Sequence, residues 1–435
     1  MKPPSEQALK NTILANGTVS SADIANAFGV SKPTAIKLLG KIGCVAMGNS
    51  VGRTYALPRP VGELGASWNL YRVDESANVE TVGKLASTNA GYYLDGACPA
   101  LFGKEFKSKL FPSLPWFLHE HRPQGFIGRN IVYNLNKSFG ISKELNSWSD
   151  SDILEYAVRF GSDLAGSLIV GEAAKSAFLA GGKPFIDESS RKERYPELAE
   201  QAVSNGVPRS SAAGEQPKFC ATVKGEDGSF RNAIVKFSGK TDNDINRRWA
   251  DLLTAEYTAL KILKKYGFPA ADAELLTAKK RVFLEYSRID RAGRYGRRGT
   301  SSLAGIDAAF IGAGGGPWAE AMRNAAEYFA KGDIETVERL YNFGLAIGNT
   351  DMHFGNISFY VGRDLPFKLA PAYDMLPMYY APLSDGTLRN EPLPSIPPTA
   401  ESREMAGDFW QTLAESGNVG KNFKRIAEGN ADLLQ

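Results

Sequence analysis

The sequence predicts an α+β protein with a small N-terminal domain and a larger, two-lobed body whose C-terminal lobe is mostly helical. Three observations lead to this fold class. The chain has 435 residues, and single hydrophobic cores stop growing near ~250–300 residues. Residues 1–57 carry their own helical spacing and are followed by two closely spaced prolines. Strand-like runs lie around 218–237 and 281–291, whereas 333–348 has helical spacing.

The composition predicts a soluble, cytoplasmic protein with no membrane partner. Hydrophobic residues make up 43% and charged residues 23% of the chain, and no apolar run approaches the ~20 residues that span a bilayer. The first residues show no apolar signal core. Cys44, Cys98 and Cys220 have neither a metal-binding nor a disulfide spacing. The formal net charge of +3 is too small to imply a nucleic-acid partner by itself, but residues 1–57 hold six Lys/Arg against two acids.

The first 57 residues have the element order of a small DNA-binding domain. Apolar spacing predicts a helix over 4–15, and serines at the start of 20–28 predict a second, capped helix. A third helix is expected over 32–39. The strand-like runs 44–47 and 53–57 enclose a glycine-containing turn, which indicates a hairpin.

The third helix supplies the candidate DNA-reading residues. Ile36 and Leu39 are expected to face the core, which leaves Lys32, Thr34 and Lys37 for phosphates and base edges. The pattern resembles a winged helix-turn-helix domain and implies duplex DNA as a partner. The alternative is a small helical module that binds protein.

The next segment is less informative. Pro58–Pro60 indicates a linker. Residues 61–150 mix short strand-like runs with an aromatic loop, which predicts a small, mostly-β subdomain. His119 and His121 lie two residues apart without a third ligand of suitable spacing, so we expect an exposed polar turn rather than a metal site.

From residue 208 the sequence has features of a nucleotide site. Gly214 lies among small residues before a strand-like run, as in loops whose amides approach phosphate oxygens. Lys236 follows three apolar residues of a predicted strand, which is the position of a phosphate-contacting lysine or of a lysine on an edge strand. A long helix is expected over 247–266. Its Glu256 could pair with Lys236 or remain solvated.

Two further segments complete the body. Residues 281–291 are rich in strand formers and suit a hinge between lobes. Eight Lys/Arg against two acids lie between Lys279 and Arg298, an excess that either binds an anionic partner or is a solvated loop. A strand-like run then leads into Asp374, and prolines flank the turn around it.

Asp351, Asn356 and Asp374 indicate phosphoryl transfer. This chemistry needs one carboxylate to orient the attacking hydroxyl, and an amide and a second carboxylate to hold Mg²⁺. Asp351 and Asn356 are five residues apart, as the catalytic Asp and metal-binding Asn are in protein kinases. Because Mg²⁺ prefers oxygen ligands, His353 is interpreted as structural rather than metal-binding.

The motifs SAAGEQPK, IVKF, IGNTDMHFGNIS and LAPAYD resemble those of the HipA-like serine/threonine kinases, toxin components of bacterial toxin–antitoxin modules. The resemblance covers about 61–435 and is strongest over 208–377. It implies a two-lobed HipA/protein-kinase-like fold, and the fused N-terminal domain is similar to that of solitary members. The expected units are a winged helix (1–57), a mostly-β subdomain (58–150), a kinase N-terminal lobe (151–286) and a helical C-terminal lobe (287–435).

The resemblance also implies roles for individual residues. Asp351 would be catalytic, Asn356 and Asp374 would bind Mg²⁺, and Ser211, beside the alternative Ser210, would be autophosphorylated. ATP would be held by Ala213, Gly214, Glu215, Gln216, Pro217, Lys218, Lys236, Ser287, Arg288, Ile289, His353, Asn356, Tyr373 and Asp374. The implied partners are a protein carrying the target Ser/Thr and a separate antitoxin.

Three positions depart from the family pattern. Gly is common where Met352 stands, Lys where Gly355 stands and Glu where Pro217 stands. These departures favour, as an alternative, a DNA-binding transcriptional regulator with a degenerate ATP-binding body. A second alternative is a metal-dependent hydrolase or nuclease built on Asp351 and His353.

Overall fold

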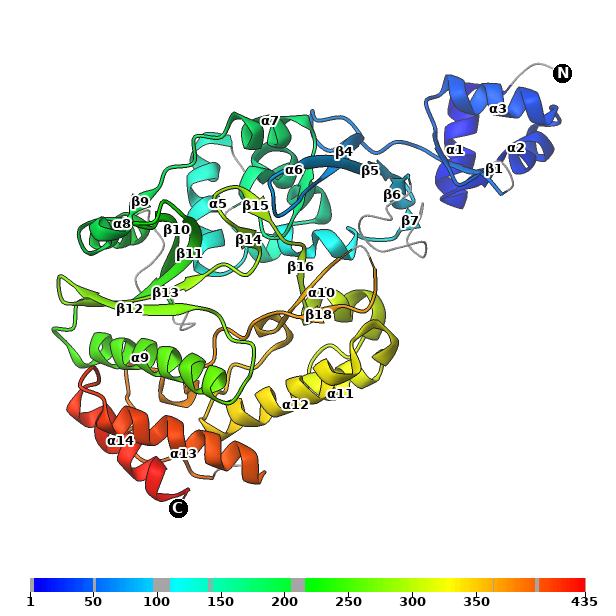
Figure 1. Cartoon of the computed structure of the whole chain (residues 1–435). Coiled ribbons are helices and arrows are strands. Elements are labelled where there is room, and N and C mark those ends of the chain that lie inside the picture. Colours follow the sequence, from blue (N-terminus) through cyan, green and yellow to red (C-terminus); the bar gives the residue numbers. More distant parts are fainter. Residues whose placement is uncertain are drawn as a thin grey trace.

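The computed structural model describes residues 4–49, 52–96, 110–139, 142, 144–204, 216–362, 364–395 and 399–434. Over these residues the protein mixes helices and strands, as the sequence predicts. A small N-terminal unit projects from one side of a larger body, and the last two helices lie far from it (Figure 1). No helix in the described part of the chain is both long and apolar enough to cross a membrane.

The N-terminal unit has three helices and an antiparallel sheet in the order β1-β3-β2. Its elements are α1 (Glu6–Asn16), β1 (Val19–Ser20), α2 (Ser21–Phe28), α3 (Lys32–Lys41), β2 (Val45–Met47) and β3 (Thr54–Ala56). Ser20 caps α2 by accepting from the Asp23 amide, and Gly29 ends the helix at a φ of 61°, a left-handed conformation that glycine adopts readily. The predicted helices and hairpin strands are confirmed.

The outer face of α3 differs from the prediction. Ala35 and Leu39 are fully buried, whereas Ile36 is 48% exposed. Residues 35 and 39 are four apart and share one face, while Ile36 lies about 100° around the helix from Ala35. The prediction that Ile36 faces the core is therefore wrong, and this side chain is exposed together with Lys32 and Lys37.

The N-terminal unit is held to the body by hydrogen bonds. Pro58 forms an isolated bridge with Thr88. The Asn89 side chain accepts from the Leu57 amide at 2.8 Å and donates to the Gly17 carbonyl at 2.9 Å. The Pro58–Pro60 segment is thus a paired connection rather than a free linker.

The body begins with a five-stranded antiparallel sheet in the order β7-β6-β5-β4-β8. Its strands are β4 (Ser67–Val73), β5 (Val79–Thr88), β6 (Gly91–Asp95), β7 (Leu110–Phe111) and β8 (Leu168–Val170). The helices of this region are α5 (Gly125–Phe139), α6 (Asp150–Phe160) and α7 (Glu172–Ala180). β8 lies beyond residue 150 and pairs with β4, so the sheet continues past the end of the segment predicted to be mostly β.

The two neighbouring histidines lie in the 3-10 helix Trp116–His121, whose first three residues are buried. The expectation of an exposed polar turn is wrong for His121, which is 2% exposed. Burial, aided by the Arg297 guanidinium, lowers the pKa of His121 to about 4.

A second sheet has the order β12-β13-β11-β10-β9. Its strands are β9 (Ile186–Asp187), β10 (Lys218–Lys224), β11 (Phe230–Phe237), β12 (Ala273–Ala278) and β13 (Arg281–Ser287), and the accompanying helices are α8 (Arg191–Ser204) and α9 (Asp244–Lys265). Helix α9 lies between this sheet and the C-terminal helices (Figure 1). Its position confirms the helix predicted over 247–266.

The remainder is mostly helical. Its helices are α10 (Leu303–Ile306), α11 (Trp318–Arg323), α12 (Lys331–Ala346), α13 (Ala400–Glu415) and α14 (Lys421–Asp432). A hairpin, β14 (Arg291–Ala292) and β15 (Gly296–Arg297), precedes the small sheet of β16 (Thr300–Ser302), β17 (Ser358–Tyr360) and β18 (Lys368–Leu369).

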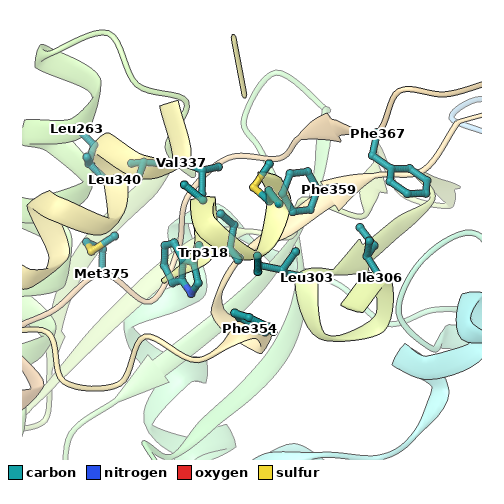
Figure 2. Packing of buried hydrophobic residues seen from close by; sticks show 14 of the residues in the cluster. Leu263, Leu303, Ile306, Trp318, Val337, Leu340, Phe354, Phe359, Phe367 and Met375 are labelled. Atoms are coloured by element: carbon teal, nitrogen blue, oxygen red, sulfur yellow. The ribbon is translucent and has the colours of Figure 1, made fainter. Parts of the chain in front are cut away.

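The largest hydrophobic core supports the loops around Asp351 and Asp374. Leu263 of α9 and Leu340 of α12 belong to it, together with Phe354 and Met375 from these loops. Figure 2 shows Trp318 and Phe354 near the centre of this packing. Because protein interiors are close-packed, the core fixes the backbone of both loops.

Candidate active site

The loop between α12 and β17 carries Asp351. The Asn349 side chain accepts from the Asp351 amide at 3.1 Å, and Asn356 Nδ2 donates to the Asp351 carbonyl at 2.6 Å. These bonds hold the backbone on both sides of Asp351, while its side chain is 56% exposed. The carboxylate is thereby presented to solvent from a fixed loop. With Nδ2 engaged, Asn356 Oδ1 is the atom that could contact a cation.

Two of the unusual residues in this loop fit their surroundings. His353 Nδ1 accepts from the Gly355 amide at 3.0 Å, and a Cβ on Gly355 would lie 2.7 Å from His353 Cε1. A side chain at 355 would thus require the imidazole to move. The Met352 sulfur lies where a Cβ on Gly344 would stand, so the absence of a side chain at 344 makes room for Met352.

Lys236 is the centre of a buried charge cluster. It projects from β11, is 2% exposed, and its Nζ lies 2.7 Å from each carboxylate oxygen of Glu256 on α9. It also pairs with Asp374. Burial disfavours the ammonium, but the carboxylates of Asp374 and Glu256 outweigh it and raise the pKa of Lys236. Of the two interpretations of Glu256, the structure shows the ion pair.

Asp374 follows β18 and faces this cluster. Burial opposes its ionisation, yet Lys236 and Lys218 lower the pKa of Asp374 to about 2, so the carboxylate is charged at neutral pH. Its φ is 53°, a left-handed conformation that Asp tolerates better than most residues. The neighbouring Tyr373 hydroxyl lies 2.6 Å from Ser358 Oγ and donates to the Gly355 carbonyl at 3.1 Å. Tyr373 therefore joins the Asp374 segment to the Asp351 loop.

A cavity of about 620 Å³ lies beside this cluster. Ser287, Arg288 and Ile289 at the end of β13 line it, as do Lys218 and Asp374. Its size is within the usual range of small-molecule sites. Residues of the predicted hinge that were assigned to ATP and one predicted metal ligand are thus brought to a single cavity. The oxygen donors of Asp374 and Asn356 suit Mg²⁺ rather than a softer metal.

Helix α5 contributes a wall that the sequence reasoning did not assign. Ile127, Ile131 and Leu135 line the same cavity. Their i, i+4, i+8 spacing marks an apolar helix face. That signal was available in the sequence, but the spacing alone does not say what the face covers.

A second cavity, of about 650 Å³, holds Asp351. Asn349, His353 and Gly355 also line it, whereas Tyr373 lines the first cavity. The hydrogen bond between Tyr373 and Gly355 therefore lies in the wall that the two cavities share. Among the described residues that line the two cavities, Lys218, Ser287, Arg288, Ile289, Tyr373 and Asp374 belong to the first and Asp351 and His353 to the second, whereas Lys236 and Asn356 line neither.

The basic segment 279–298 is largely used inside the protein. Arg288 pairs with Asp290, and Arg291 pairs with Asp290 and Asp163. Although burial opposes ionisation, Arg288 and Arg291 hold the pKa of Asp290 well below its ordinary value. Most of the arginines in this segment join elements of the body, which neither earlier interpretation of the basic excess described.

The predicted phosphate loop is only partly within the described residues. Ser210, Ser211, Ala213, Gly214 and Glu215 lie outside them. In the described part, Gln216 Nε2 donates to the Phe237 carbonyl at 2.7 Å, and the Pro217 carbonyl accepts from the Phe237 amide at 3.0 Å. Lys218 is the partner of Lys236 in the antiparallel pairing of β10 with β11. The loop thus leads directly into the strand beside Lys236. No group of three or more His, Cys, Asp or Glu placed to hold a metal occurs within the described ranges.

The charge cluster thus lies beside one cavity, and Asp351 lies in the cavity next to it. Comparison with known proteins identifies the family. Residues 64–179 match the YjjJ-like toxin middle domain, and residues 210–431 match the HipA-like C-terminal domain. The chain is 31% identical over 428 residues to Toxin YjjJ of Escherichia coli K12, covering 96% of this chain and 95% of that protein. The chain therefore belongs to the family of HipA-like toxins that includes Toxin YjjJ, which confirms the resemblance found in the motifs.

Two solved structures are also similar. The first is HipA of Shewanella oneidensis MR-1, in a complex with HipB and operator DNA. It shares 13% identity with this chain, with 84% of this chain and 96% of that chain covered and a TM-score of 0.49. The second is the proinflammatory kinase CtkA of Helicobacter pylori, which shares 11% identity with this chain. The match covers 50% of this chain and 92% of that chain, with a TM-score of 0.32.

Proposed function

We propose that this protein is a serine/threonine protein kinase that transfers the γ-phosphate of ATP to a protein target and to its own Ser211. The observation that carries the proposal is the cluster of Lys236, Glu256 and Asp374 at a nucleotide-sized cavity, joined through Tyr373 to the loop that presents Asp351. This is the constellation that kinase chemistry requires, because the enzyme contributes mainly positioning and charge.

Each residue then has a stated role. Asp351 orients the acceptor hydroxyl and accepts its proton, and Asn356 and Asp374 hold Mg²⁺. Lys236 contacts the phosphates while Glu256 fixes its position. Bound Mg·ATP supplies the transferable phosphoryl group and the cation that offsets its charge. The hinge 287–289 and the α5 wall hold the adenine ring.

The N-terminal unit is proposed to be a winged helix that binds duplex DNA. The support is the wide exposed face of α3, where Lys32, Thr34 and Lys37 are all exposed while Ala35 and Leu39 form the core side. Basic side chains on one exposed helix face suit phosphates and base edges. The HipA of S. oneidensis was solved together with HipB and operator DNA. For this chain we propose a cytoplasmic protein that reads DNA through its own 1–57 unit, with a separate antitoxin as a further partner.

Intact-mass measurement after incubation with Mg²⁺ and ATP tests the kinase activity. The parent should gain phosphate, chiefly at Ser211, and the isosteric Asp351→Asn should not. Asp385→Asn, a change at an exposed loop position of the same lobe, is the matched control and should gain phosphate as the parent does. An unchanged parent mass with retained ATP binding would select the alternative, a DNA-binding regulator with an ATP-sensing body.

A further inference from the structure

The cavity that holds Asp351 has a second wall made of glycine. Gly314, Gly315 and Gly316 line it together with the 349–355 loop, and no Lys or Arg is among the described residues around it. A Cβ built on any of these three glycines would meet no atom within 4 Å. The space beside these glycines is therefore open and is not filled by a neighbouring side chain.

This glycine loop is anchored at its beginning. The Asp307 carboxylate accepts from the Ala313 amide at 2.8 Å and from the Gly314 amide at 3.0 Å. Asp307 is 7% exposed and begins a π-helical turn, Asp307–Ile311, a feature frequent at functional sites. The hydrogen bonds to Asp307 therefore fix the backbone where the loop begins.

The far end of the loop is tied to the candidate catalytic loop. Pro317 is the N-cap of α11, and the indole of the buried Trp318 donates to the Met352 carbonyl at 3.2 Å. Met352 is the residue next to Asp351. The glycine wall and the Asp351 carboxylate thus keep a defined relation across the cavity.

The chemistry of the wall selects one kind of ligand. Across the described residues, the amides of Gly315 and Gly316 make no hydrogen bond to protein, and their φ values of 157° and 109° suit glycine alone. Unpaired amides without side chains recognise carbonyl groups, as when an extended peptide pairs with exposed backbone. Unpaired amides can also bind an anionic oxygen, but no Lys or Arg is among the described residues that line this cavity and the Asp351 carboxylate repels an anion, so a neutral carbonyl group is favoured.

We propose that the Gly314–Gly316 loop is the seat of the acceptor: an extended, uncharged protein segment pairs with its backbone and presents a Ser or Thr hydroxyl to Asp351. This assignment rests on the proposed kinase function and narrows its substrate class. Acceptor segments with acidic residues beside the Ser or Thr are excluded.

The test uses the full chain and an array of short Ser-centred peptides with neutral or acidic flanks. One measurement gives the amount of protein bound to each peptide (capture), and a second gives the phosphate transferred to it. Gly314→Asn adds a side chain to the cavity at a φ of 72°, which Asn tolerates. It should lower both capture and transfer at least about tenfold while ATP binding stays at the parental level. Gly182→Asn is the matched control, because Gly182 has a φ of 76° and equally open surroundings away from this cavity. It should behave as the parent.

Each result decides a separate question. Parental capture and transfer by Gly314→Asn, or equal use of acidic and neutral peptides, would overturn the acceptor seat and leave the kinase proposal intact. If the parent protein captures neutral peptides but transfers no phosphate, the proposed kinase reaction is wrong. If Gly314→Asn then loses this peptide capture, the glycine loop is still the peptide-binding site. A parent that captures no peptide overturns the seat.

Discussion

Replacing Lys236 by Met removes the cation that lies between the buried Glu256 carboxylate and the partly exposed Asp374 carboxylate. Met keeps most of the apolar stem and removes the charge. In the parent, the Lys236 and Glu256 side chains are 3% and 0% exposed, and Asp374 is 22% exposed. The variant therefore leaves the Glu256 carboxylate buried with no partner at this position.

The cost follows from this burial. Removing one partner of a buried ion pair costs about 3–5 kcal/mol, because the remaining charge is uncompensated. For a unit the size of the HipA-like part, residues 210–431, each kcal/mol shifts the melting temperature by ~2–4 °C, so the expected fall is about 6–20 °C. Adding Glu256→Leu removes the stranded carboxylate and should recover more than half of the loss, because Asp374 can still reach water.

Thermal unfolding at neutral pH, followed by circular dichroism, measures these shifts. Lys218→Met is the matched control on the neighbouring strand, since Lys218 is only half-buried and should cost less than about 1 kcal/mol. Both Lys236 variants should also lose ATP binding, because they remove the proposed phosphate contact. A Lys236→Met protein that melts with the parent, or a double variant less stable than the single one, would refute the buried-charge reasoning.

The remaining predictions concern pH, metal and DNA. Folding lowers the pKa of His121 from 6.5 to about 4, so as pH falls through this window the unfolded chain takes up a proton before the folded chain does, and about 3 kcal/mol of stability is lost. The variant His121→Phe should show a smaller loss of stability with falling pH in thermal melts. A pH profile identical to that of the parent would contradict this prediction. Asn356→Ala and Asp374→Asn should each weaken Mg²⁺-dependent ATP binding about tenfold or more in calorimetry, and parental affinity in both would reject these ligands. Replacing Lys32 and Lys37 by Ala should flatten the slope of log K for duplex DNA binding against log salt by about 1.8 units, as measured by fluorescence anisotropy. Phosphate transfer should be unchanged in this variant. An unaltered slope would remove both residues from the proposed DNA interface.

The residues of the candidate site were predictable because their pattern is local. Asp351 and Asn356 lie on one short loop, so their spacing in the sequence fixes their relation in space. The apolar strand before Lys236 did not by itself decide its role, because the same pattern fits a lysine on an edge strand. Its partner Glu256 was not decided, because whether a helix carboxylate faces a strand depends on how α9 packs on the sheet.

The features that the sequence did not reveal depend on contacts between distant segments. The burial of His121 and the role of α5 at the cavity arise where the first sheet region meets the second. In the sequence, Arg291 is indistinguishable from a surface charge, because its partner Asp163 lies far earlier in the chain. Ile36 was misplaced because two apolar stripes fit the same short helix, and only packing against the other elements of the N-terminal unit selects Ala35 and Leu39.

The unusual residues of the Asp351 loop argue for a specialised site rather than a decayed one. Met352 is matched by Gly344, and Gly355 is matched by the imidazole of His353, so each departure has a partner that accommodates it. The Met352 carbonyl also receives the Trp318 indole, which connects the altered loop to the glycine wall. Loss of function would relax these contacts independently, whereas here they are mutually consistent and converge on the cavity that Asp351 shares with the glycine loop. The same residues that set this chain apart from the family pattern therefore shape the space in which we place its protein substrate.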